Sequence, residues 1–208
     1  MALILIAYAS RHGHTAKVAE RLADDWRCAQ HEVLLANVAH GRMDPLVAAA
    51  SAIVVAAPVH YSRHPRRIEN FVRRHLGGLH AAPSALVSVC GALAGQWAEG
   101  PAEARRYVDA LLELTRWRPR MVLSVAGALP YREYGFMTRW FMRRVSAWTG
   151  RPTDTSRNYE FTNWSDVDRF AVEFQSLLEP QGAAGAAAPG ESASPDVIPE
   201  MRCPPVLR

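Results

Sequence analysis

The residues nearest the N-terminus that could bind a charged ligand form one hexapeptide, Ser10-Arg11-His12-Gly13-His14-Thr15. It joins a short apolar run to a segment with helical spacing, so it stands where a helix begins. Backbone N–H groups at a helix N-terminus lack intrahelical partners and, aided by the helix dipole, bind phosphate. Gly13 permits close approach, and the Ser10 and Thr15 hydroxyls can donate to phosphate oxygens. An ordinary turn with Ser10 or Thr15 as the helix cap explains the segment equally well.

Two later segments suit a flat aromatic ring. The segment Pro58-Val59-His60-Tyr61 offers a rigid turn, an apolar residue and two planar side chains that can lie against an isoalloxazine. The second segment is glycine-rich, so its backbone can approach a ring edge, and Trp97 follows it as a candidate stacking partner. Its candidate contact residues are Val89, Cys90, Gly91, Ala92, Leu93 and Ala94. Tyr61 and Trp97 could equally be plain surface aromatics.

The sequence of the phosphate loop also limits which class of nucleotide can bind. It lacks both the G-x-G-x-x-G dinucleotide fingerprint and the G-x-x-x-x-G-K-[ST] P-loop. A mononucleotide such as FMN therefore fits best. No metal is expected: His60 and His64 have the i,i+4 spacing of a helical metal pair, but Pro65 disfavours helix just before it and no third ligand is evident. Cys90 ends a buried apolar run, where a thiol usually serves as a small apolar side chain.

Strands that alternate with helices must position these loops. Apolar runs predict strands at 3–7, 33–36, 52–57, 85–89 and 121–126, and helical spacing predicts helices at 14–29, 65–76, 102–115 and 164–178. Asn163 or Thr162 can cap the last helix. The alternation indicates an α/β fold with a parallel sheet covered on both faces. The flavodoxin-like strand order 2-1-3-4-5 places the three loops at the carboxyl ends of strands 1, 3 and 4, where such sheets bind ligands.

Length and composition predict one domain with a tail. A chain of 208 residues that is 49% hydrophobic can bury one sizeable core, which we assign to residues 1–179. Residues 180–208 contain Ala, Gly, Pro and Ser without a periodic apolar face, so we expect a disordered tail. No segment offers the ~20 consecutive apolar residues that span a bilayer. We therefore expect a location in the cytosol or at a membrane surface.

An inserted segment, residues 130–152, separates the fifth strand from the last helix. Its large apolar residues follow approximately helical spacing, and arginines occupy the other positions. This composition is typical of an interfacial membrane helix, although a stripe packed on the core or on a partner subunit fits equally well. A second arginine group surrounds the second loop and comprises Arg63, Arg66, Arg67, Arg73 and Arg74. It could attract carboxylates, but no nucleic-acid recognition fold is evident, so no nucleic acid is expected.

Four motifs together resemble those of the quinone-dependent protoporphyrinogen IX dehydrogenases, enzymes of bacterial haem synthesis with a flavodoxin-like domain. The motifs are SRHGHT at 10–15, TRWRP at 115–119, AGALPYREYGFMTRWFMRR at 126–144 and GRPTDTSRNYEFTNW at 150–164. The resemblance extends over residues 3–179. It is most specific in the insertion and in the segment that returns from it.

The resemblance implies noncovalent FMN and the oxidation of protoporphyrinogen IX to protoporphyrin IX, with menaquinone or ubiquinone as acceptor. It also implies a peripheral enzyme on the cytoplasmic side of the inner membrane. The flavin would carry the redox chemistry, so no side chain is assigned a catalytic role. Ser10–Thr15 would hold the phosphate, while Pro58–Tyr61 and Val89–Ala94 would hold the ring. Candidates for contact with the substrate are Arg63, Arg132, Tyr134, Arg139 and Trp140.

Other functions of the same fold remain open. A flavodoxin-like NAD(P)H:quinone oxidoreductase would use the same loops with another electron donor. A flavodoxin-like electron carrier is disfavoured by the net charge of +4, because such carriers are usually acidic and dock on basic partners. A domain that has lost its flavin and binds a partner protein is a third alternative. The sequence leaves open whether the chain forms a homo-oligomer.

Overall fold

The computed structural model describes residues 1–94, 97–129, 154, 156 and 158–178. The predicted insertion at 130–152 and the predicted tail at 180–208 therefore lie outside the described residues.

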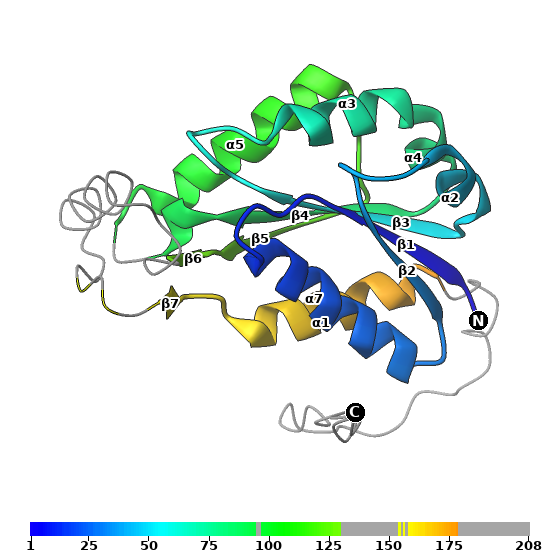
Figure 1. Ribbon diagram of the computed structural model, residues 1–208, viewed down its shortest axis with the longest axis horizontal. Helices are drawn as coiled ribbons and strands as arrows, with labels where there is room; N and C mark the ends of the chain where they lie inside the picture. Colours follow the sequence, from blue (N-terminus) through cyan, green and yellow to red (C-terminus); the bar gives the residue numbers. More distant parts are fainter. Residues whose placement is uncertain (95–96, 130–153, 155, 157, 179–208) are drawn as a thin grey trace, which may run out of the picture.

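A five-stranded parallel sheet forms the centre of the molecule (Figure 1). Its strands are β1 (Leu3–Tyr8), β2 (Glu32–Asn37), β3 (Ala52–Pro58), β4 (Ser84–Cys90) and β5 (Met121–Ala126). They lie in the order β2-β1-β3-β4-β5, which confirms the predicted flavodoxin-like topology. Every residue of β3 and β4 is buried, as expected for strands covered on both faces.

Helices cover both faces of this sheet (Figure 1). On one face lie α1 (His14–Cys28) and α7 (Trp164–Ser176), and on the other lie α2 (Asp44–Ala49), α3 (Arg66–Arg74), α4 (Leu76–Ala81) and α5 (Gly100–Thr115). The core on each face of the sheet contains a buried tryptophan whose indole N–H donates a hydrogen bond. Trp26 donates to the Ala171 carbonyl at 2.9 Å, and Trp117 donates to Ser84 Oγ at 3.1 Å. Successive residues of each strand point to opposite faces of the sheet, so alternate residues belong to the two apolar cores, one on each face.

Two helical details differ from the sequence prediction. The helix expected at 65–76 is α3, which ends at Arg74 because the φ of −108° at His75 departs from helical values, and α4 beyond it was not predicted. The short helix α2 was not predicted, because six residues are too few for a periodic pattern to stand out. At α7, Asn163 is the cap, and its side chain accepts a hydrogen bond from Ser165 N at 3.2 Å.

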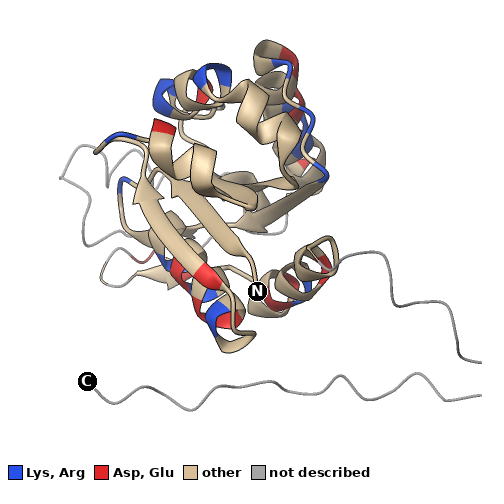
Figure 2. Cartoon of the chain, turned by 90° about the vertical axis from the view of Figure 1, so that its right-hand side faces the viewer, with Lys and Arg blue, Asp and Glu red and all other residues tan. Residues whose placement is uncertain are grey.

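The chain leaves β5 and returns to α7 through a small antiparallel pair, β6 (Ala128–Leu129) and β7 (Tyr159–Glu160). Charged residues lie on the helices and loops, and Glu32 is the only one in the five strands of the main sheet (Figure 2). Within the ranges that the structure describes, no helix has the length and apolar character needed to cross a membrane.

Candidate functional site

The loop between β1 and α1 begins the helix on a glycine. Gly13 is the N-cap and has a φ of 77°, and no side chain caps the helix. The alternative in which Ser10 or Thr15 serves as the cap is therefore excluded. The first helical hydrogen bond joins Lys17 N to Gly13 O at 2.9 Å, and the N–H groups of His14, Thr15 and Ala16 donate to no other described residue. These N–H groups form the donor set that a helix N-terminus offers to an anion.

One further polar group in this loop has no partner. The Ser10 hydroxyl oxygen is buried and makes no hydrogen bond. A buried hydroxyl without a partner is costly, and a phosphate oxygen would satisfy it. A Cβ placed on Gly13 would meet nothing within 4 Å, so the space beside the backbone is open. The loop thus fits a phosphate group in both its donors and its free space.

The loop after β3 is a tight two-residue turn. His60 N donates to Arg63 O at 2.9 Å, and Arg63 N donates to His60 O at 3.3 Å. Tyr61 and Ser62 between them have φ values of 51° and 61°, which residues other than glycine rarely adopt. The side chain of Tyr61 is 84% exposed at the tip. Tyr107 of α5 supports the turn through its hydroxyl, 3.3 Å from Ser62 Oγ.

The first two loops meet through a pair of histidines. The rings of His12 and His60 lie edge to face with their centroids 6.2 Å apart. Burial lowers the pKa of His60, and the charges of His12 and Arg11 lower it further. His60 Nε2 is buried and makes no hydrogen bond. The structure therefore brings together two of the segments that the sequence singled out.

The third loop follows β4 and lies beside the second. Val59 N donates to Val89 O at 2.8 Å, which joins the first residue after β3 to β4, the strand that leads into the third loop. Cys90 is buried, and its sulfur accepts a hydrogen bond from Ala92 N at 3.4 Å as residues Gly91–Leu93 form a short 3-10 helix. A Cβ on Gly100 of α5 would come within 2.4 Å of Ala92 O, so the helix packs closely on this loop. Trp97 is half-buried.

His64, four residues after His60, contacts a strand of the sheet. Its side chain is buried, and its Nε2 is 3.1 Å from Ser88 Oγ on β4. Burial lowers the pKa of His64 to about 4. Across residues 1–94, 97–129, 154, 156 and 158–178, no group of three or more His, Cys, Asp or Glu side chains is arranged to hold a metal ion. His64 therefore connects the second loop to the sheet.

The segment that returns from the insertion holds the start of α1, a contact that the sequence did not predict. His14 Nε2 lies 2.6 Å from Thr162 Oγ1. Lys17 donates to a Glu160 carboxylate oxygen at 2.7 Å, and Trp164 donates to the other oxygen at 2.8 Å. Burial raises the pKa of Glu160, but the hydrogen bonds from Lys17 and Trp164 outweigh it and the net shift is downward. A pocket of about 280 Å³ separates this segment from the phosphate loop; its lining residues are His12, Gly13, His14, Lys17, Ala128, Asn158, Tyr159 and Glu160.

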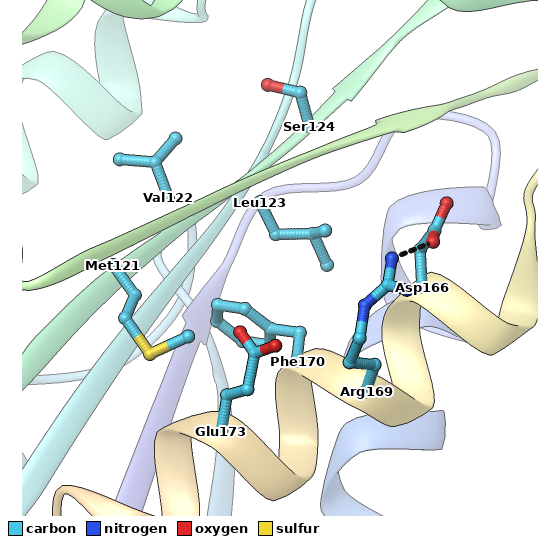
Figure 3. A pocket seen from close by; sticks show the side chains of 8 residues that line it. All are labelled: Met121, Val122, Leu123, Ser124, Asp166, Arg169, Phe170 and Glu173. Atoms are coloured by element: carbon cyan, nitrogen blue, oxygen red, sulfur yellow. Dashed lines mark hydrogen bonds and ion pairs between the residues drawn. The ribbon is translucent and has the colours of Figure 1, made fainter. Parts of the chain in front are cut away.

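A second, larger pocket lies away from the three loops. Its volume is about 420 Å³, and it is formed between the edge strand β5 and α7 (Figure 3). Asp166 and Arg169, which form an ion pair, and the ring of Phe170 line its α7 side. None of the residues that the sequence singled out lies in it.

The predicted substrate contacts are mostly outside the described part of the chain. Arg63 is exposed and closes the turn after β3, next to Tyr61. The other four, Arg132, Tyr134, Arg139 and Trp140, lie outside the described residues.

Curated relatives match most of the chain. Protoporphyrinogen IX dehydrogenase [quinone] from Escherichia coli (strain K12) is 28% identical over 175 residues, which are 84% of this chain and 96% of the relative. A protein of the same name from Leishmania major is 29% identical over 179 residues, 83% of this chain and 74% of that protein. These matches confirm the resemblance carried by the four motifs.

Solved structures and a sequence family identify the fold. Oxidised flavodoxin 1 from Bacillus cereus superposes with a TM-score of 0.53 at 14% identity and covers 86% of this chain and 100% of its own. Oxidised flavodoxin 2 from the same organism gives 0.52 at 18% identity, over 85% and 99% of the two chains. The flavodoxin domain family matches residues 5–156, which include the sheet and all three loops. The chain belongs to the flavodoxin domain family.

Proposed function

We propose that this chain binds FMN noncovalently at the three loops and oxidises protoporphyrinogen IX to protoporphyrin IX, with a membrane quinone as acceptor. The observation that carries this proposal is the similarity, over 84% of the chain, to a relative named protoporphyrinogen IX dehydrogenase [quinone]. Menaquinone and ubiquinone are both compatible with that name. The reaction would place the chain in haem biosynthesis.

The phosphate loop supports the choice of FMN. A mononucleotide ends in a phosphate dianion, and the loop offers the free N–H groups of α1, the open space at Gly13 and the buried Ser10 hydroxyl. Arg11 is exposed beside these donors and adds positive charge. When bound, the flavin supplies the capacity to accept hydride equivalents.

The chain's own residues would position the ring. The tip of the second loop carries the exposed Tyr61 side chain, which is free to lie against an aromatic face. The third loop presents its backbone at Gly91 and Ala92, and the packing of Gly100 against Ala92 O fixes that backbone in place. The bond from Val59 N to Val89 O holds the start of the second loop against β4, the strand that leads into the third loop. These contacts would orient the ring and keep water from one of its edges.

Arg63 is a candidate partner for the substrate. Protoporphyrinogen IX carries two propionates, and a guanidinium can bind a carboxylate through two parallel hydrogen bonds. Arg63 is exposed and pairs with His60 across the turn that carries Tyr61. We expect Arg63→Glu to raise the substrate KM and to leave bound FMN unchanged. Unchanged kinetics would remove Arg63 from this role.

We also propose a peripheral position on the cytoplasmic side of the inner membrane, because a quinone acceptor is dissolved in lipid. Arg66 and Arg67 follow Arg63 in the sequence and are exposed like it, and positive charge attracts anionic lipid headgroups. Flotation of the full chain with vesicles that contain an anionic lipid tests this position. Flotation that is no greater than with neutral vesicles would contradict it.

Anaerobic turnover tests the proposed reaction. The purified chain, reconstituted with FMN, is mixed with protoporphyrinogen IX and a menaquinone analogue, and porphyrin fluorescence is followed. We expect porphyrin to form only when the quinone is present. A parallel reaction replaces the porphyrinogen with NADH or NADPH and follows quinone reduction.

Each arm of this experiment separates the proposal from an alternative. Rapid reduction by a nicotinamide without porphyrin formation would indicate an NAD(P)H:quinone oxidoreductase. A flavin-containing chain that is inactive with both donors would indicate an electron carrier. A purified chain that takes up no flavin, seen as no absorption bands in the blue, would remove the cofactor from the proposal.

A further inference from the structure

Two buried polar atoms without partners lie on neighbouring loops. They are Ser10 Oγ, after β1, and His60 Nε2, after β3. The two strands are adjacent in the sheet and parallel, with Tyr8 opposite Ala56, so both loops start at the same edge. Buried polar atoms in native proteins are nearly always hydrogen-bonded, and an unpartnered one indicates a function or a missing ligand.

The backbone of His60 is held by the turn, and its ring faces His12. Both hydrogen bonds of the turn involve His60 itself, and the preceding residue, Val59, is held by its bond to Val89 O. The ring stands edge to face with His12 of the phosphate loop, at a centroid separation of 6.2 Å. His60 is therefore directed toward the phosphate loop, whereas the exposed Tyr61 lies at the tip of the turn.

We propose that His60 belongs to the phosphate site: its Nε2–H donates a hydrogen bond to the FMN phosphate from the second loop, opposite the donors of Ser10 and α1. This inference rests on the proposed binding of FMN. It moves His60 from the ring contacts, where the sequence placed it, to the anion. His60 then joins the two loops through the ligand.

The charges around His60 make this contact sensitive to pH. Burial lowers its pKa, and the charges of His12 and Arg11 on the β1 loop add to that effect. Arg63, which closes the same turn, is also basic, and Tyr107 of α5 meets the turn through Ser62 as a neutral phenol. A phosphate dianion offsets these positive charges and stabilises the protonated imidazole, so the pKa of His60 is higher with FMN bound than without it. Through His60, binding then takes up a proton, and the contribution of His60 to FMN affinity rises as the pH falls between these two pKa values.

Three variants distinguish a phosphate contact from a ring contact. His60→Phe keeps a planar ring but has no donor, His60→Gln keeps a donor that does not titrate, and Tyr61→Asn removes the exposed ring at the tip. Affinity is measured by quenching of flavin fluorescence, with FMN and with riboflavin, which has the same ring and no phosphate. We expect His60→Phe to weaken FMN by about 10- to 100-fold, the usual effect of losing a hydrogen bond to a charged group. Riboflavin binding should not change.

The control, Tyr61→Asn, and the conservative variant, His60→Gln, should affect flavin affinity differently. Tyr61→Asn should weaken FMN and riboflavin by the same factor, because it acts on the ring alone. His60→Gln should retain more FMN affinity than His60→Phe. Between pH 5.5 and 8 it should also take up fewer protons on binding than the wild type, measured by calorimetry in buffers of different ionisation enthalpy. The far-ultraviolet circular dichroism of each apoprotein establishes that the variant is folded.

The outcomes separate the two proposals. Binding of FMN by His60→Phe with wild-type affinity, or equal weakening of FMN and riboflavin, would overturn the role of His60 and leave the proposed function standing. A wild-type chain that binds neither FMN nor riboflavin would overturn the proposed function itself. If His60→Phe does not fold, equal proton uptake by the wild type and His60→Gln would still overturn the role.

Discussion

His14 and Thr162 are 148 residues apart in the sequence, yet His14 Nε2 lies 2.6 Å from Thr162 Oγ1. The Thr162 hydroxyl donates its hydrogen to Ala126 O at 2.7 Å. Its oxygen must then accept, so His14 carries its proton on Nε2. One hydroxyl thus joins the first turn of α1, the end of β5 and the segment that leads into α7.

Removing this hydroxyl should destabilise the fold. Thr162→Val leaves His14 Nε2–H and the Ala126 carbonyl without a partner in a part-buried position. We expect a loss of about 1–3 kcal/mol in the free energy of unfolding, measured in urea. Ser176→Ala is the matched control, because its exposed hydroxyl bonds only to Glu173 O, and it should change stability by less than about 0.5 kcal/mol. Equal effects of the two substitutions would show that Thr162 does not join the three segments.

Substituting two glycines that have similar φ values should distinguish the cost of backbone strain from an effect on FMN binding. Gly13 and Gly41 have φ values of 77° and 80°, and a Cβ on either meets nothing within 4 Å. Alanine at each position should therefore cost about 1–2 kcal/mol of stability from the left-handed backbone. Only Gly13→Ala should weaken FMN, by about tenfold or more, because only Gly13 lies in the phosphate loop. Fluorescence titration of both folded variants checks this, and equal affinities would exclude close approach of the ligand at Gly13.

The contact between α5 and the third loop should be sensitive to a single methyl group. A Cβ on Gly100 would come within 2.4 Å of Ala92 O, a backbone atom, so the loop must move. We expect Gly100→Ala to cost about 1–3 kcal/mol and to weaken both FMN and riboflavin. The control is Gly77→Ala in α4, where a Cβ meets nothing within 4 Å. That change should be neutral or stabilise by up to about 1 kcal/mol. Intact flavin binding by Gly100→Ala would show that the third loop does not hold the ring.

His64 should make the fold less stable in acid. Burial holds its pKa at about 4 in the folded state, against 6.5 for an unperturbed histidine. The unfolded chain therefore binds a proton first, and stability falls as the pH drops from about 6.5 to about 4, by up to about 3 kcal/mol. The double variant His64→Phe/Ser88→Ala removes the titrating group together with its partner.

Urea unfolding of the double variant at several pH values in this window checks the prediction. Its stability should fall less steeply with pH than that of the wild type. Some dependence will remain, because burial also lowers the pKa values of His14, His60 and His75. A slope identical to that of the wild type would mean that His64 does not contribute.

The strands could be predicted because each apolar run is continuous and is followed by a polar loop, whereas their order was taken from one of the two common arrangements of a doubly wound sheet. β3 and β4 are buried throughout, so their sequences are continuously apolar and lack the polar residues at helical spacing that would indicate an amphipathic helix. The short helix α4 was not predicted, since Gly77 and Gly78 are poor helix formers and six residues show no clear period. Local pattern therefore identified the elements more securely than their ends.

The sequence could name the segments at the carboxyl ends of the strands but not the contacts between them. Tyr61 and Ser62 adopt positive φ without being glycines, so nothing in the sequence indicated the two-residue turn. The link from His14 to Thr162 spans most of the chain and leaves no periodic pattern. Such contacts depend on packing between distant elements, which residue spacing does not encode.

The β6–β7 pair marks a place where the intervening stretch of chain can be replaced. Ala128 is paired with Glu160 and Leu129 with Tyr159, so the two ends of the intervening stretch lie at strand-pairing distance from each other. A protein engineer could join them with a two-residue hairpin turn, or attach the corresponding stretch of another protein, without altering the spacing of the five main strands.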